Sequence, residues 1–206
     1  MFADSRHQAE AFRTTLEGKI HQLVSEFADG RISREQFNVL YERYNGRLSI
    51  TNHALLSGTP EAFTIAQNGP STIAIRDATM GKALGLMIYH NRSGTIVETL
   101  GDFNAPLDRV GRVLNDYSQM MVDGQFIDRH IENLDTRQWL LFVPGRFTTT
   151  VTLFHNEPSP LQIRELERMQ HHFEEANRVA LVRDRIEADR LAYPFIGFVQ
   201  KQYGKK

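Results

Sequence analysis

The stretch from Gly85 to Val179 limits most strongly what this chain can fold into. Strand-forming segments, tight turns and apolar segments of helical period follow one another there in a fixed order: strand, strand, helix, three strands, long helix. That order predicts one antiparallel sheet of about five strands with helices packed against it, which is an α+β fold. No catalytic motif lies within the stretch. We therefore expect the chain to bind a partner rather than to transform a substrate.

The strands of this sheet are predicted from runs of β-branched and aromatic residues. These runs are Leu84–Tyr89, Thr95–Leu100, Phe126–Leu134, Gln138–Val143 and Phe147–His155. The first two flank Asn91–Gly94, a good hairpin turn. The last alternates apolar residues with threonines, so we expect one buried face and one wetter face.

Two helices complete the pattern. A central helix is predicted from Leu107, after Asn104-Ala105-Pro106, to a stop at Asp123-Gly124. The closing helix begins at Ser159, with Gln162 as its capping-box partner, and its apolar stripe continues to about Leu191. Such a helix has about 30 residues and spans about 45 Å, longer than the strands. We expect its far half to overhang the sheet and to seek a partner.

An α-helical hairpin is predicted to precede the sheet. Apolar residues recur at steps of three and four from Ala9 to Phe27, and a second helix follows from Ser33 to Leu48, after Gly30. Two helices cannot bury both stripes alone. The hairpin is therefore expected to pack either on the main domain or on another copy of itself.

Composition divides the chain into four parts. They are a hairpin at 1–49, a linker at 50–70, an α+β domain at 71–192 and an aromatic and basic tail at 193–206. The linker is rich in Gly and Pro, and a short helix is expected near Glu61–Gln67. Residues 71–82 alternate like a strand at Ile73 and Ile75, although their alanines would tolerate a helix; a strand is favoured.

Charge and cysteine content exclude several functions. The formal net charge is −1, so no global field draws the chain to nucleic acid or anionic lipid. The chain has no cysteine, which excludes disulfides, thiolate zinc sites and a cysteine nucleophile. The sequence shows neither a signal peptide nor an apolar run long enough to cross a bilayer. We expect a soluble cytoplasmic protein, with no nucleic-acid partner and no stable membrane insertion.

The candidate chemical motifs each lack a required residue. Met80-Gly81-Lys82 resembles the end of a phosphate-binding loop, but Arg76 and Ala83 stand where Gly and Ser or Thr are needed. His171, His172 and Glu175 lie on one helix, but a metal needs three or four converging ligands. We predict no catalytic residue, no metal and no cofactor. Trp139, the single tryptophan, is predicted to lie in the core.

The tail from Tyr193 to Lys206 leaves two alternatives open. Its aromatic residues either pack back onto a groove of the protein itself or dock on a partner or membrane surface. Pro194 and Gly197 argue against a stable helix. Phe195 and Phe198 are the candidate interface residues of this segment.

The Gly85–Val179 stretch resembles the roadblock/LC7 family. The hairpin GLMIYHNRSGTIVETLG resembles the first two strands of that family, and PLDRVGRVLNDYSQMM resembles its central helix. The resemblance implies a non-enzymatic homodimer that presents a platform to a small Ras-like GTPase, or to a signalling or motor complex. It places candidate interface positions on the central helix, at Leu107, Val110, Leu114 and Tyr117. The N-terminal hairpin separately resembles short bacterial helical-hairpin modules.

Two other functions compete with this one. A small-ligand sensor of the PAS/GAF type has the same general architecture, an antiparallel sheet packed with helices. Its cavity would lie beside Leu84–Tyr89 and Gln138–Val143. An enzyme would need a cleft holding acids of perturbed pKa, which a sequence does not show.

Overall fold

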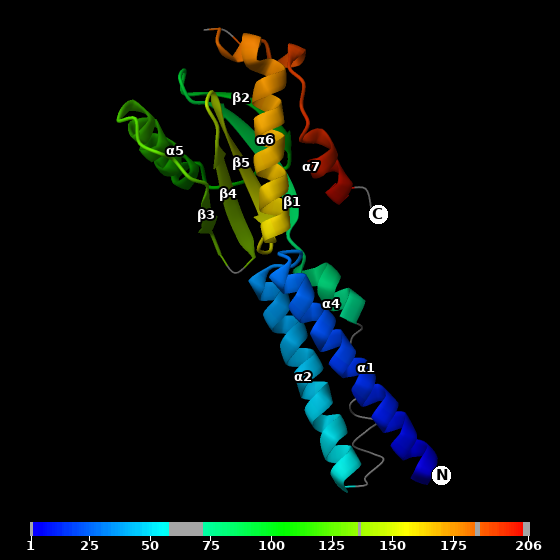
Figure 1. Cartoon of the computed structure of the whole chain (residues 1–206). Coiled ribbons are helices and arrows are strands. Elements are labelled where there is room, and N and C mark those ends of the chain that lie inside the picture. Colours follow the sequence, from blue (N-terminus) through cyan, green and yellow to red (C-terminus); the bar gives the residue numbers. More distant parts are fainter. Residues whose placement is uncertain (1, 58–71, 136, 184–185, 204–206) are drawn as a thin grey trace. The chain divides into compact units, whose positions relative to one another are not determined.

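The computed structural model describes residues 2–57, 72–135, 137–183 and 186–203 (Figure 1). The chain divides into two compact units, Met1–Met80 and Gly81–Lys206. The first unit is helical, and the second contains one five-stranded antiparallel sheet with helices. The predicted α+β fold, with its helical hairpin and its long helix after the sheet, is confirmed. No helix among these described residues combines the length and the apolar character needed to cross a bilayer.

The first unit is built on a hairpin of two long helices. Helix α1 spans Phe2–Ala28 and α2 spans Arg34–Ser57. Gly30 makes the turn between them in the left-handed region, with φ of 71°. At the start of α2 the hydroxyl of Ser33 accepts a hydrogen bond from the N–H of Gln36 at 3.2 Å. The main apolar cluster of the hairpin is Leu16, Leu23, Ile32, Leu40 and Tyr44.

The segment predicted as a strand at 71–82 is instead a helix, α4 (Thr72–Thr79), followed by the first residues of the sheet. A helix places Ile75 against the hairpin cluster and leaves Ile73 71% exposed, whereas a strand would have put both on one face. Gln36 Nε2 donates to the carbonyl of Arg76 at 3.0 Å, and Arg76 pairs with Glu26. Packing on the hairpin therefore decides the helical state, and α4 belongs to the first unit.

Helix α2 also runs past the predicted start of the linker at residue 50. It continues to Ser57 because Thr51 and Ala54 are buried, Ala54 beside Ala9 of α1. The remainder of the linker, with the helix expected near 61–67, lies outside the described residues.

The second unit is organised around strand β5. The strands are β1 (Lys82–His90), β2 (Thr95–Gly101), β3 (His130–Asn133), β4 (Gln138–Pro144) and β5 (Thr148–His155). They lie in the order β2-β1-β5-β4-β3, and every neighbouring pair is antiparallel. Strand β3 is shorter than the predicted 126–134. Only its four residues pair with β4, and Phe126 is 89% exposed.

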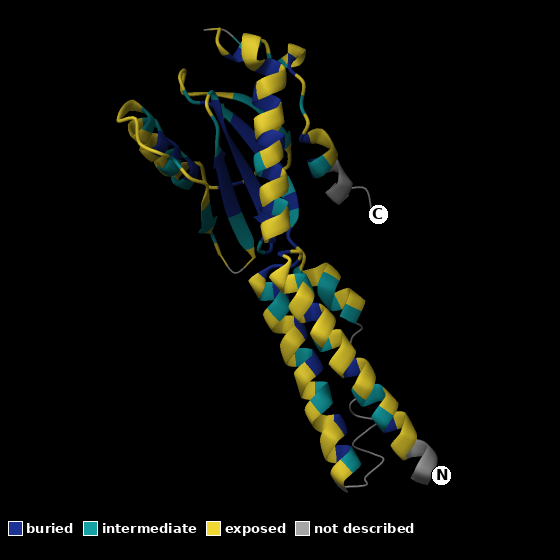
Figure 2. Ribbon diagram, viewed as in Figure 1, coloured by how far each residue is buried: buried dark blue, intermediate teal, exposed yellow. Residues whose placement is uncertain are grey.

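Helices cover both faces of this sheet. Helix α5 (Leu107–Val122) covers one face, where it packs on Met87, Leu140 and Phe142. Helices α6 (Pro160–Leu181) and α7 (Ile196–Tyr203) contribute to the apolar cluster of the other face, which includes sheet residues Leu86, Ile88 and Leu141. Figure 2 shows the inner strands buried between these layers.

The expectation of a wetter face on the last strand is wrong. The side chains of Thr148, Thr149, Thr150 and Thr152 are all 0% exposed. Strand β5 lies at the centre of the sheet, between β1 and β4, and both of its faces are covered. Its threonines are therefore strand formers in a buried position rather than markers of a solvent face.

The predicted overhang of the closing helix is also wrong. Helix α6 ends at Leu181, after 22 residues, and the chain then folds back. Asn177 fixes the returning segment, because its side-chain amide donates to the carbonyl of Ala192 and accepts from the N–H of Ala192, both at 2.8 Å. The short 3-10 helix η1 (Ala188–Arg190) lies within this return.

The tail packs on the second unit itself, which is the first of the two alternatives. Phe195 is 0% exposed, and its ring centroid lies 5.6 Å from that of Phe173 on α6. Contrary to expectation, a helix forms here: Pro194 lies two residues before the first residue of α7, so it removes no hydrogen bond from the helix interior. Phe198 is half-buried against the same cluster.

Because Phe195 fills the core, Phe195→Ala should lower the free energy of unfolding of the second unit by about 3–5 kcal/mol. Urea denaturation followed by the fluorescence of Trp139, the single tryptophan, reports on this unit. The matched control is Ile196→Ala, at a neighbouring side chain that is 40% exposed, with an expected loss of at most about 0.5 kcal/mol. Equal losses in the two variants would contradict the packing described for the tail.

Candidate functional site

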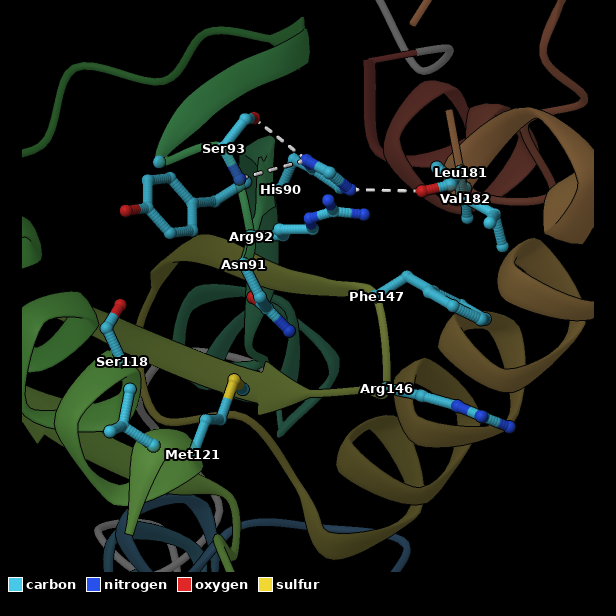
Figure 3. Close-up of a pocket in the computed structure, with 13 residues that line it drawn as sticks. His90, Asn91, Arg92, Ser93, Ser118, Met121, Arg146, Phe147, Leu181 and Val182 are labelled. Atoms are coloured by element: carbon cyan, nitrogen blue, oxygen red, sulfur yellow. Dashed lines mark hydrogen bonds between the residues drawn. The ribbon is translucent and has the colours of Figure 1, made fainter. Parts of the chain in front are cut away.

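A pocket of about 640 Å³ lies at one end of the sheet of the second unit (Figure 3). Two hairpin turns form part of its lining, namely the β1–β2 turn at 91–94 and the β4–β5 turn at 145–147. The end of β1 contributes Tyr89 and His90, and the C-terminal end of α5 contributes Ser118, Met121 and Val122. Leu181 at the end of α6 and Val182 directly after it complete the lining. We refer to this site as the turn-end pocket.

Asn91 ties the two turns together. Its Nδ2 donates to the carbonyl of Gly145 at 3.1 Å, and its Oδ1 accepts from the hydroxyl of Thr149 at 2.8 Å. Its backbone N–H donates to the carbonyl of Phe147 at 2.9 Å. One side chain thus fixes the spacing of both turns that border the pocket.

His90 holds the β1–β2 turn against the end of α6. The backbone N–H of Ser93 donates to Nδ1 of His90 at 3.3 Å, so Nδ1 is the acceptor nitrogen. Nε2 then carries the proton and donates to the carbonyl of Leu181 at 3.1 Å. The imidazole is 3% exposed, and both nitrogens are used within the protein. His90 is therefore part of the wall rather than a group that meets a ligand.

A buried carboxylate, that of Glu174 on α6, holds the β4–β5 turn from behind. It accepts hydrogen bonds from the backbone N–H groups of Arg146, Phe147 and Thr148 at 2.8–2.9 Å. The hydroxyl of Thr148 donates to it at 3.0 Å. Charge-assisted bonds of this kind are about twice as strong as neutral ones. Gln170, one helical turn earlier, adds a bond from its Nε2 to the carbonyl of Thr148 at 2.8 Å.

The lining of the turn-end pocket combines apolar side chains with two guanidinium groups. Arg92 comes from the β1–β2 turn and Arg146 from the β4–β5 turn, while Met121, Phe147 and Val182 supply apolar surface. Among the described residues that line the pocket there is no aspartate or glutamate. The site is suited to binding rather than to acid–base chemistry, because its one buried histidine is already fully bonded.

The interface positions expected on the central helix mostly face inward. Val110, Leu114 and Tyr117 are at most 7% exposed and pack on the sheet. The Tyr117 hydroxyl donates to the carbonyl of Asp128 at 2.9 Å, and burial, aided by the charge of Asp128, raises the pKa of Tyr117 to about 12. These three side chains anchor α5 to its own unit. Of the four, Leu107 alone is open to a partner, at 67% exposure.

The two candidate interface residues of the tail are also largely covered by the protein itself. Phe195 lies in the core and Phe198 is half-buried, so neither offers a free aromatic surface. An apolar stripe has the same sequence pattern whether it faces its own unit or a partner, which is why the prediction of an interface at these two residues does not match their burial.

Two further motifs were considered as chemical sites, namely Met80-Gly81-Lys82 and the histidines of α6. The carbonyl of Gly81 accepts a hydrogen bond from Gln162 Nε2 at 2.7 Å, which joins the start of β1 to the start of α6. His171 and His172 are exposed on α6. Within the described part of the chain, no group of three or more His, Asp or Glu side chains could hold a metal ion.

Sequence reasoning missed the residues that build the pocket walls, His90, Asn91 and Glu174. One signal was available for Glu174. Gln170, Glu174 and Asn177 lie at steps of four and three along the buried stripe of α6, where apolar residues would be expected. Polar residues at such positions usually bond to buried backbone groups.

Comparisons of the chain with models of known protein families, with curated proteins and with solved structures find no match.

Removal of the Glu174 carboxylate should destabilise the second unit, because three N–H groups of the β4–β5 turn lose their acceptor. We expect Glu174→Ala to lower the free energy of unfolding by about 3 kcal/mol, measured by urea denaturation with Trp139 fluorescence. Hydrogen exchange of the amides at 146–148 should accelerate as well. The control is Glu175→Ala, at the adjacent exposed carboxylate, with a change within about 0.5 kcal/mol. Unchanged exchange at 146–148 would refute the clamp.

Proposed function

We propose that this chain is a non-enzymatic regulatory or scaffolding protein that acts as a homodimeric binding platform. In this proposal the hairpin of the first unit joins two copies, and the second unit presents the surface that a partner recognises. The cytoplasmic location expected from the sequence is part of the proposal. The observation that carries it is a row of partly exposed aromatic rings on the hairpin.

These rings belong to both helices of the hairpin. The centroids of Phe27 on α1 and Phe37 on α2 lie 4.7 Å apart, and Phe37 stacks on Tyr41 at 5.4 Å. Phe27 is 39% exposed and Tyr41 40% exposed. Val24, three residues before Phe27 and 46% exposed, extends the same side of α1. We call Val24, Phe27, Phe37 and Tyr41 the hairpin stripe.

The size of the hairpin supports a second copy as the occupant of this stripe. Helix α1 has 27 residues, so the hairpin is about 40 Å long and about 20 Å wide. One face of that size can supply the roughly 800 Å² per partner that stable interfaces bury. Two hairpins packed through their stripes make a four-helix arrangement, which buries apolar surface that one hairpin leaves in water.

A small-ligand sensor is the second candidate, but its cavity cannot lie where the sequence analysis expected it. The middles of β1 and β4 are filled on both faces by side chains of the protein's own helices. The observation that favours a sensor is the turn-end pocket, whose volume falls within the range of small-molecule sites, roughly 300–1,000 Å³.

Dimerisation through the hairpin stripe should be lost in the double variant Phe27→Ser/Tyr41→Ser. Both side chains are partly exposed, so the fold of the monomer should persist. Light scattering after size exclusion, at tens of micromolar, should give twice the monomer mass for the wild type and the monomer mass for the variant. The control is Val39→Ser, at an apolar residue of equal exposure (39%) outside the stripe, which should remain dimeric. A monomeric wild type would contradict the proposal.

A small Ras-like GTPase is proposed as the partner on the basis of the resemblance at residues 85–179. The full chain, immobilised, should retain such a GTPase from a lysate of the source cells in the presence of a non-hydrolysable GTP analogue. Retention should fall with GDP, because the two nucleotides order the switch segments differently. Mass spectrometry identifies the retained protein. Equal retention of every GTPase in both nucleotide states would contradict this part of the proposal.

A further inference from the structure

We propose that the turn-end pocket binds a small uncharged molecule, namely an apolar body that carries one hydroxyl or carbonyl group. The inference rests on the second candidate function, a small-ligand sensor, and adds to it the class of the ligand. It does not depend on the hairpin stripe, because the turn-end pocket is formed within the second unit.

Apolar side chains from three separate segments line the space of the pocket. Met121 and Val122 come from the end of α5, and Val182 directly follows the end of α6. The ring of Tyr89 comes from β1. Figure 3 shows Met121 and Val182 on opposite sides of the pocket. Val122 is 81% exposed and Val182 56% exposed, so a ligand that covers them removes apolar surface from water.

Most polar side chains of the lining already have partners within the protein. Both imidazole nitrogens of His90 and both ends of the Asn91 amide are bonded, as described above. The hydroxyl of Ser93 is bonded to His90, and that of Ser118 donates to a backbone carbonyl of its own helix. These groups build the walls and leave a ligand few hydrogen bonds to make.

The two arginines of the lining also make contacts of their own. The guanidinium of Arg146 lies over the ring of Phe147, 5.3 Å from its centroid, and Arg92 already has an interaction partner within the protein. Neither aspartate nor glutamate occurs in the described part of the lining. An ionic ligand would therefore lose its hydration shell and find both arginines in other contacts, whereas a neutral ligand avoids that cost.

The hydroxyl of Tyr89 is the polar group that remains for a ligand, because it has no hydrogen-bond partner among the residues that the structure describes. It lies beside the β1–β2 turn, 3.3 Å from the position that a Cβ would take at Gly94, which also lines the pocket. A phenol hydroxyl can both donate and accept a hydrogen bond. It therefore suits a hydroxyl or a carbonyl group of the ligand.

The walls are fixed before any ligand arrives. Asn91, His90 and Glu174 hold the two turns and the end of α6 through the hydrogen bonds described above. A pocket whose walls are already ordered loses little conformational entropy when it binds. A small ligand with few polar groups can therefore bind there measurably.

The test uses the full chain and four probes that share a phenylpropyl body: 3-phenylpropanol, propylbenzene, 3-phenylpropanoate and 3-phenylpropylammonium. Nuclear magnetic resonance of the methyl groups of Met121, Val122 and Val182 during titration locates the site and gives the affinity. The alcohol should shift these signals and bind about tenfold more tightly than the acid or the ammonium ion. Tighter binding of either ion than of the alcohol would overturn the proposal. Absence of shifts with all four probes would contradict the small-ligand candidate as well.

The variant Tyr89→Phe tests the hydrogen bond, because it removes only the hydroxyl. It should weaken binding of 3-phenylpropanol about fivefold and leave the affinity for propylbenzene unchanged. The hydroxyl has no partner in the free protein, so the variant should fold as the wild type does, as checked by circular dichroism and by Trp139 fluorescence. Equal affinity of the variant and the wild type for the alcohol would contradict the role assigned to Tyr89.

Two adjacent methionines locate the apolar contact. Met121 lines the pocket, whereas Met120, which is 37% exposed, does not. Met121→Ala should weaken binding of both 3-phenylpropanol and propylbenzene about fivefold, because it removes apolar contact area, and Met120→Ala should bind as the wild type does. Unchanged binding by Met121→Ala would overturn the assignment to this pocket. All three variants lie outside the hairpin stripe and should keep the mass of the wild type in light scattering, so a failure here is distinguishable from a failure of the dimer.

Discussion

The central strand β5 has helices on both of its faces, and the arrangement of the second unit follows from that burial. Val151 and Leu153 belong to the apolar cluster under α5, while Phe154 belongs to the cluster under α6. A strand with no wet face requires a helical layer on each side of the sheet. Helix α6 by itself does not cover the whole of its face of the sheet, because β1 and β2 also need a covering layer there. The tail supplies the missing cover with Phe195 and Val199, and for that reason the chain must turn back after Leu181.

Buried polar groups then decide which parts of this unit are rigid. Glu174, Gln170 and Asn177 lie in the buried stripe of α6, and each bonds to backbone groups outside the helix. Glu174 and Gln170 hold the β4–β5 turn, and Asn177 holds the return of the chain. A buried polar group without a partner is costly, so these bonds specify one position for each loop. The turn-end pocket exists because its borders are fixed in this way.

The proposed function gives the two units different roles. The first leaves an aromatic row on a hairpin whose own cluster is small, and a second copy of the chain suits that surface. The second has an apolar cluster on each face of its sheet, and the turn-end pocket lies at the end of the sheet. There, arginines from two turns meet exposed apolar side chains from two helices. The proposed function assigns assembly to the first unit and recognition of a partner to the second.

The sequence by itself determined the kind and order of the main elements. Apolar periodicity, the Ser159 capping box and the Asn91–Gly94 turn are local signals, and the hairpin, the strand order along the chain and the start of α6 follow from them. Only the tertiary structure decided the state of residues 72–79, the end of α6, the burial of the β5 threonines and the inward orientation of Val110, Leu114 and Phe195. Each of those depends on which surface lies opposite, and an apolar stripe does not specify its partner. The pocket was out of reach of the sequence for the same reason: its residues come from four separate segments that only folding brings together.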